Sequence, residues 1–62
     1  MIYKLKAKRV EKGIKQGDLA NQLGISRQNL NAIENGKTEP KRDLMIKIAK
    51  ALNEDVTVLF FQ

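Results

Sequence analysis

The stretch "QGDLANQLGISRQNLNAIENGK", residues 16–37, decides the fold. Its first part, residues 16–23, carries two leucines four positions apart, a spacing that places both on one face of a helix. Gly24 follows, and glycine readily adopts the left-handed conformation that ends a helix. Ser26 is a preferred N-cap residue, so a second helix is predicted to begin after it and to end at Asn35-Gly36. Two short helices joined by a tight turn predict a helix-turn-helix unit.

The spacing inside this unit has a mechanical reason. Ala20 is small, which lets the second helix of the unit cross close to the first. Apolar side chains from both helices are expected to fix the crossing angle, and these are Leu19, Leu23, Ile25, Leu30 and Ile33. With that angle fixed, the outer face of the second helix is free to enter a DNA major groove.

That outer face carries Arg27, Gln28 and Asn31, and the helix contains a single acid, Glu34. An arginine can make two hydrogen bonds to guanine O6 and N7, and a glutamine or asparagine can do the same with adenine N6 and N7. For any one residue, an ordinary solvated helix surface is the simpler hypothesis. For the set as a whole, the pattern favours base recognition.

Helical patterns flank the unit on both sides. A helix is expected over about residues 3–12, and another after Pro40. The end, "VTVLFFQ" (56–62), predicts either a short helical turn capped by Asp55 or a strand, because it is β-branched and aromatic. The opening "MIY" could pair beside it. The prediction is an all-α, compact five-helix bundle that leaves open a short terminal β-pairing.

Composition limits the classes of function. The chain has 62 residues, which allows one small domain (1–62) that is marginally stable alone. It has no cysteine and no histidine, so disulfides and the usual zinc ligands are excluded and no cofactor is expected. Twelve basic residues against seven acidic give a net charge of +5, which favours a polyanionic partner. No apolar run would span a membrane, so we expect a cytoplasmic protein.

The run "KAKRVEKGIKQGDLANQLGISRQNLNAIENGKTEPKRDLMIKIAKAL", residues 6–52, resembles the Cro / phage-repressor (XRE) family of helix-turn-helix DNA-binding proteins. The pieces that match are "KRVEKGIKQ", "LA" with "LG" after it, "SRQNLNAIENGK" and "IAKAL". The resemblance implies a bundle of five helices whose second and third form the DNA-reading unit. It also implies an internal salt bridge between Arg9 and Glu34.

The resemblance further implies contacts with DNA. It gives Gln16 two roles, to bind a backbone phosphate and to support a side chain of the recognition helix. Lys15 and Lys41 depart from the family, which usually has a capping serine or threonine at these positions. The expected DNA-binding residues are Gln16, Ser26, Arg27, Gln28, Asn31, Asn35, Lys37, Lys41 and Arg42.

We therefore interpret the chain as a sequence-specific regulator of transcription that binds double-stranded DNA, expected to be a repressor encoded by a bacterium or a phage. One alternative is the DNA-binding antitoxin of a toxin–antitoxin pair. Another is a helical module that binds an acidic protein. An enzyme is the weakest hypothesis, because no catalytic set of histidine, cysteine or paired carboxylates is evident. The chain ends soon after the last helix, so no small-molecule ligand is expected.

A single subunit of this size would read too few base pairs to find a unique site among the competing sites of a genome. We therefore expect a homodimer on a palindromic operator. The C-terminal segment carries more apolar surface than one helical turn can bury. The expected interface is formed by Val58, Phe60 and Phe61, with "MIY" beside them.

Overall fold

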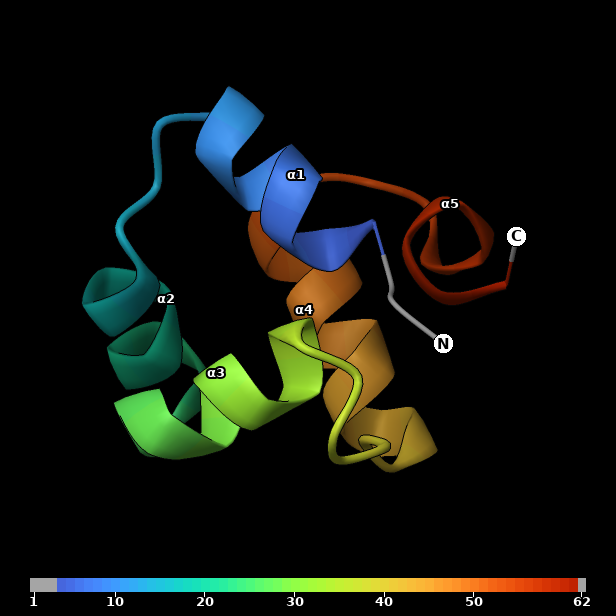
Figure 1. Cartoon of the computed structure of the whole chain (residues 1–62). Helices are drawn as coiled ribbons and strands as arrows, with labels where there is room; N and C mark the ends of the chain where they lie inside the picture. Colours follow the sequence, from blue (N-terminus) through green and yellow to red (C-terminus); the bar gives the residue numbers. More distant parts are fainter. Residues whose placement is uncertain (1–3, 62) are drawn as a thin grey trace.

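The computed structural model describes residues 4–61, which form five α-helices (Figure 1). The helices are α1 (Leu5–Glu11), α2 (Gln16–Leu23), α3 (Arg27–Glu34), α4 (Arg42–Leu52) and α5 (Val56–Phe60). This confirms the predicted all-α bundle, and no strand occurs within residues 4–61. The pairing considered for "MIY" lies outside the described residues. None of the helices found in this part of the chain combines the length and the hydropathy needed to cross a bilayer.

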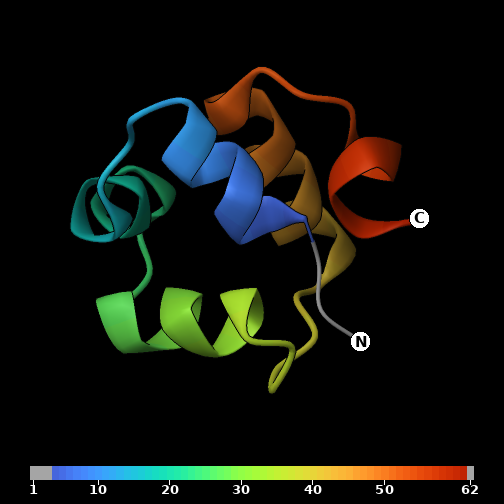
Figure 2. The same ribbon diagram turned by 45° about the horizontal axis from the view of Figure 1, so that its top comes forward.

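The arrangement of the helices leaves one face of α3 uncovered. α4 contacts both α2 and α5, and α2 also packs against α3. In Figure 2, α3 lies along one edge of the molecule, and α1, α2 and α4 all lie on the same side of it. This position allows α3 to bury one face and to expose the opposite one.

The core is built from the apolar residues that the sequence pattern predicted. Its fully buried side chains include Leu5, Leu19, Leu30, Ile48 and Leu59. The apolar residues expected to fix the crossing angle of the helix-turn-helix are buried as well, except for Ile25, which is only partly buried. Burying a side chain of this size stabilises the fold by about 1.5–3 kcal/mol, so these contacts dominate the stability of a small domain.

The turn between α2 and α3 begins at Gly24, the residue predicted to make it. Gly24 ends α2 in the left-handed conformation, with φ of 74°. Ala20 is 2% exposed, so there is no room for a larger side chain at this position. The backbone N–H of Ile25 donates to the Ala20 carbonyl at 3.0 Å, which closes the turn. Together these features set the angle at which α3 leaves α2.

The C-terminal segment is helical, so the strand alternative for residues 56–60 is wrong. The Asp55 carboxylate accepts hydrogen bonds from the Thr57 backbone N–H at 3.0 Å and from its hydroxyl at 2.9 Å. This N-cap starts a helix that the β-branched composition alone does not favour. Leu59 and Phe60 then turn into the core, where they are 1% and 3% exposed.

The cap makes a testable contribution to stability. The hydrogen bonds from the Thr57 amide and then from its hydroxyl hold the pKa of Asp55 below its usual 3.8. A lowered folded-state pKa stabilises the protein above the unfolded pKa, and this stabilisation is lost as the pH falls through the folded pKa. We expect Asp55→Ala to lower the Tm at neutral pH, and the difference from wild type to shrink below pH 3.8. Thermal melts across this range test the cap, and a difference that stays constant with pH would contradict it.

Candidate nucleic-acid interface

α3 begins and ends at defined signals, which fixes the side chains that it exposes. The Ser26 hydroxyl accepts the Asn29 backbone N–H at 3.0 Å, so Ser26 is the predicted N-cap. After α3, Gly36 adopts a φ of 74° and directs the chain away from the helix. Between these ends, Leu30 and Ile33 are buried against the core. The other side of the helix therefore faces solvent.

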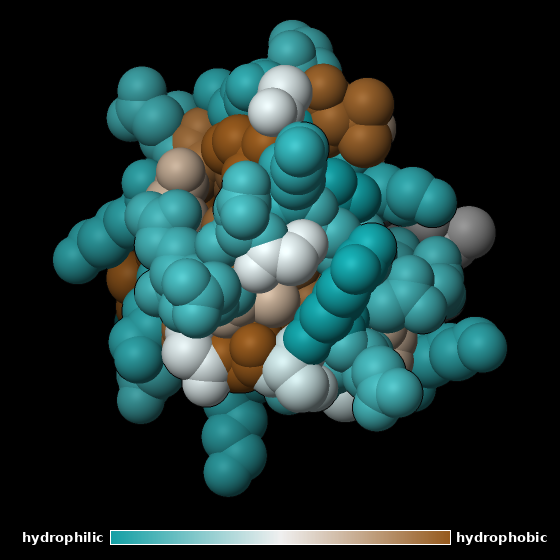
Figure 3. All heavy atoms as spheres, turned by 90° about the vertical axis from the view of Figure 1, so that its left-hand side faces the viewer, coloured by the Kyte–Doolittle hydropathy of each residue, from teal (hydrophilic) through white to brown (hydrophobic). Residues whose placement is uncertain are grey.

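The residues expected to contact DNA lie mostly on this exposed side. Arg27, Gln28, Asn31 and Asn35 are exposed, and Gln16 on α2 is half-buried beside them. Figure 3 views the molecule from the side of α2 and α3, and hydrophilic side chains cover most of that face. The expected reading residues thus share one surface with the start of α2.

The salt bridge between Arg9 and Glu34 is present, and it is buried. Arg9 Nε lies 2.6 Å from Glu34 Oε2, and Arg9 Nη2 lies 3.2 Å from Oε1. The two side chains are 9% and 0% exposed. Arg9 also donates from Nη1 to the Ile14 carbonyl at 2.8 Å. One guanidinium therefore ties α1 to α3 and to the loop that precedes α2.

Gln16 connects this buried pair to the exposed surface. Its Nε2 donates to Glu34 Oε1 at 3.0 Å and to Asn31 Oδ1 at 3.3 Å. Its Oε1 accepts from Arg27 Nε at 3.4 Å. Asn35 Nδ2 donates to the same Asn31 oxygen at 3.4 Å. A continuous set of hydrogen bonds thus runs from the interior to the recognition side chains.

The direct contact between Gln16 and Glu34 was not predicted from the sequence. The resemblance implied a supporting role for Gln16 and, separately, the Arg9–Glu34 pair, but no link between them. The predicted burial of the Glu34 carboxylate could have indicated this contact, because a buried carboxylate needs several hydrogen-bond donors and one arginine supplies only some of them.

Three expected phosphate-binding cations lie away from this network. Lys37 is in the loop after α3, and Lys41 and Arg42 are at the start of α4. Within residues 4–61, none of the three has an ion pair or a side-chain hydrogen bond. By contrast, Lys8 on α1 and Lys12 directly after that helix lie 4.0 and 3.3 Å from Glu54.

Three helices, α1, α2 and α4, begin without a capping side chain. Lys15 and Lys41 occupy the N-cap positions of α2 and α4, and neither makes a side-chain cap hydrogen bond. The first backbone N–H groups of each helix therefore point outward without a side-chain acceptor, and the positive end of the helix dipole lies there. Such ends are suited to an anion.

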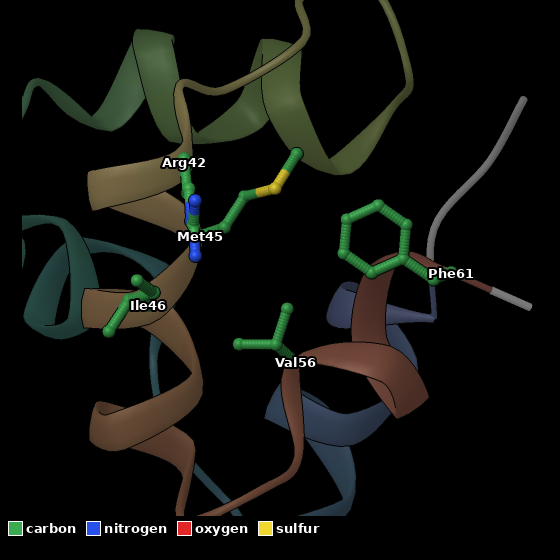
Figure 4. Close-up of a pocket in the computed structure, with 5 residues that line it drawn as sticks. All are labelled: Arg42, Met45, Ile46, Val56 and Phe61. Atoms are coloured by element: carbon green, nitrogen blue, oxygen red, sulfur yellow. The ribbon is translucent and has the colours of Figure 1, made fainter.

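The residues expected at a dimer interface have different environments. Phe61 is 62% exposed and Val58 is partly buried. Phe60 was wrongly placed at the interface, because the helical turn of α5 directs its side chain into the subunit's own core. Phe61 lines an open, mainly apolar pocket, and Figure 4 shows its ring across that pocket from α4. The other lining residues are Arg42, Met45, Ile46 and Val56.

Comparison with known proteins places this geometry in context. The model of a helix-turn-helix family matches residues 5–59. An uncharacterized HTH-type transcriptional regulator of Methanocaldococcus jannaschii is 44% identical over 60 residues, which cover 97% of this chain and 91% of that protein. The ImmF control region 10 kDa protein of Bacillus phage phi105 is 44% identical over 55 residues, or 89% of this chain and 61% of that protein.

Solved structures agree with the fold. The restriction-modification controller protein C.AhdI from Aeromonas hydrophila superposes with a TM-score of 0.83 at 30% identity, covering 90% of this chain and 85% of that one. The clp gene regulator ClgR from C. glutamicum superposes with a TM-score of 0.80 at 28% identity, covering 86% and 69%.

Proposed function

Because the chain belongs to the helix-turn-helix family of DNA-binding transcriptional regulators, of the Cro and XRE type, we propose that it is a repressor that reads specific duplex sequences with α3 in the major groove. The observation that carries this proposal is the division of α3 into two faces. Leu30 and Ile33 are buried, whereas Arg27, Gln28 and Asn31 are exposed. Glu34, the single acid of α3, is buried in the interior, away from the phosphates that would repel it.

Selection of bound sites from a random pool of duplex DNA tests this function. The proposal expects one recurring sequence with two-fold symmetry. A pool that shows no enrichment, or binding that is indifferent to sequence, would overturn it. Binding to an acidic protein with no affinity for duplex DNA would favour the helical-module alternative.

Affinity should come mainly from phosphate contacts made around α3. The unpaired cations Lys37, Lys41 and Arg42 and the uncapped start of α4 support this part of the proposal. Cations that meet phosphate release counterions from the DNA, and this makes binding sensitive to salt. Base contacts then supply the sequence information that phosphate contacts lack.

Replacing Lys41 or Arg42 with glutamine is expected to reduce the slope of log affinity against log salt by about 1 each. The loss should be nearly equal on all sequences, because a phosphate contact reads no bases. Lys47→Gln is the matched control, since Lys47 is also an exposed cation of α4 but lies beyond its first turns. Isotherms at several salt concentrations provide the measurement. The same slope change in all three variants would show that only net charge matters.

We also propose that the protein binds DNA as a homodimer through the surface around Phe61. An aromatic ring that is 62% exposed beside an apolar pocket supports an interface there. A two-fold dimer would place its two recognition helices about 34 Å apart, which is one turn of B-DNA. Each subunit would then read one half of a palindromic operator.

Phe61→Asp is expected to convert the dimer into monomers and to weaken binding to the palindrome, because it places a charge in an apolar contact. Val10→Asp is the control, since Val10 is 60% exposed but lies on α1. Sedimentation at micromolar concentration measures the assembly. A wild-type monomer that binds a palindrome without cooperativity would contradict the proposal, and so would a dimer that tolerates Phe61→Asp.

A further inference from the structure

The Gln16 side chain lies between a group that can only accept hydrogen bonds and a group that can only donate them. Within residues 4–61, the side-chain groups that hydrogen-bond to the Glu34 carboxylate are all donors, from Arg9 and from Gln16. On the other side, the Arg27 guanidinium has no acceptor atom. Gln16 therefore turns its nitrogen to Glu34 and its oxygen to Arg27. A rotated amide would set oxygen against oxygen and N–H against N–H, so one orientation is strongly preferred.

Gln16 in turn fixes the orientation of the Asn31 amide. Gln16 Nε2 donates to Asn31 Oδ1 at 3.3 Å, and Asn35 Nδ2 donates to that oxygen at 3.4 Å. Two donors converge on the oxygen, so the Asn31 amide is held with its oxygen turned toward α2. Its Nδ2 has no hydrogen-bond acceptor among residues 4–61. The two hydrogens of that amide are left for a group outside the protein.

We propose that buried Glu34 acts through Gln16 to turn the Asn31 amide into a hydrogen-bond donor on the recognition surface, beside Arg27, which can only donate. Glu34 and Gln16 are positioning residues here, and Arg27 and Asn31 meet the DNA. Glu34 suits this role because its side chain is 0% exposed and Arg9 holds it in place. This inference rests on the proposed function, since it assumes that α3 lies in the major groove.

A donor surface selects among bases by the acceptors that they present. In the major groove, guanine offers two acceptors, O6 and N7, and thymine offers O4. Adenine offers N7 beside the N6 donor group, so its two-bond pairing needs an amide oxygen. Asn31 has committed its oxygen to Gln16 and Asn35. The base that faces Asn31 is therefore guanine or thymine, in place of the adenine that asparagine can otherwise bind.

Gln28 provides an internal contrast. It is exposed on the same helix, and no residue within 4–61 makes a hydrogen bond to its side chain. Its amide can turn either way, so it remains able to pair with adenine. The polarity that Glu34 sets should therefore be confined to the base facing Asn31.

The first test is Asn31→Asp, which keeps the size of the side chain and keeps an oxygen for Gln16 and Asn35. The atom that faces the groove changes from a donor to an acceptor. Selection from a random duplex pool should change the base at one position per half-site, from guanine or thymine to cytosine or adenine, by about tenfold or more in relative affinity. Comparing sequences for one variant removes the effect of the added charge on total affinity. An unchanged preference at every position would overturn the inference.

The second test is Gln16→Met, which removes the relay but keeps a side chain of similar length. Relative affinities at the base facing Asn31 should fall toward equality, while the preferences at the bases facing Arg27 and Gln28 should persist. A purely structural role for Gln16 would weaken all positions together, and that result would overturn the positioning role. A wild type that selects no sequence would instead overturn the proposed function itself, and this inference with it. A wild type that selects a sequence with adenine at the Asn31 position would overturn the inference alone.

Discussion

Glu34→Gln is expected to lower the free energy of unfolding by about 3–5 kcal/mol, because it removes one charge from a buried ion pair. The substitution preserves the shape of the side chain, so the loss reports the charge rather than a cavity. Arg9 would stay 9% exposed, with the Ile14 carbonyl and an uncharged amide in place of a carboxylate. For a small domain this is a large part of a total stability of about 5–15 kcal/mol. Chemical denaturation of both proteins measures the difference.

The control for this result is a partly exposed ion pair between the residue after α1 and the loop before α5. Lys12 lies 3.3 Å from Glu54, with side chains 30% and 23% exposed. Lys12→Met should cost about 0–1 kcal/mol, the usual range for a surface pair. The double variant Arg9→Met with Glu34→Leu should recover much of the stability, because well-packed apolar residues can replace a buried pair. Single effects of Arg9→Met and Glu34→Leu that simply add in the double variant would show that the two charges are not coupled.

Arg27→Ala and Gln28→Ala are each expected to weaken binding to the selected site by about 1–3 kcal/mol, which is roughly 5- to 150-fold. Both side chains are exposed, and neither contributes to the core, so thermal melts should hardly change. The loss should be much smaller on unrelated DNA, where no base contact exists to be removed. Gln22→Ala is the matched control, because Gln22 is an exposed glutamine on α2 outside the expected DNA-binding set. Melts that fall while specific affinity holds would mean that α3 does not face the groove.

Local sequence signals predicted most of the helical framework. The limits of α2 follow from its leucine spacing and from Gly24, and α3 starts at the Ser26 cap as predicted. These signals are reliable because each depends on a few neighbouring residues and on backbone chemistry that does not change with the fold.

The C-terminal segment was harder to predict because two local signals disagree. Its valines and phenylalanines favour a strand, whereas the Asp55 cap favours a helix. Packing of α5 against α1 and α4 decides for the helix. The register of that helix then determines that Phe60 is buried and Phe61 exposed, which neither side chain reveals by itself.

The hydrogen bonds around Gln16 could be predicted only in part. The sequence pattern placed Arg27 and Asn31 on one face, and the family resemblance implied a supporting Gln16 and, separately, the Arg9–Glu34 pair. It could not indicate which atoms meet, because this depends on the crossing angle of α2 and α3 and on the side-chain rotamers. Interhelical contacts of this kind join residues 11 to 25 positions apart, beyond the range of any periodic pattern.

The burial of Glu34, two hydrogen bonds away from the reading side chains, also bears on how such a protein diverges over generations. Gln28 can be exchanged without disturbing any hydrogen bond within residues 4–61, so a lineage can acquire a new operator base there in one mutational step. A single substitution at Glu34 would instead lower both the stability of the fold and the preference for particular bases, unless Arg9 changes as well. Neutral drift is therefore expected to explore Gln28 first, and the polarity read by Asn31 should be inherited with the fold.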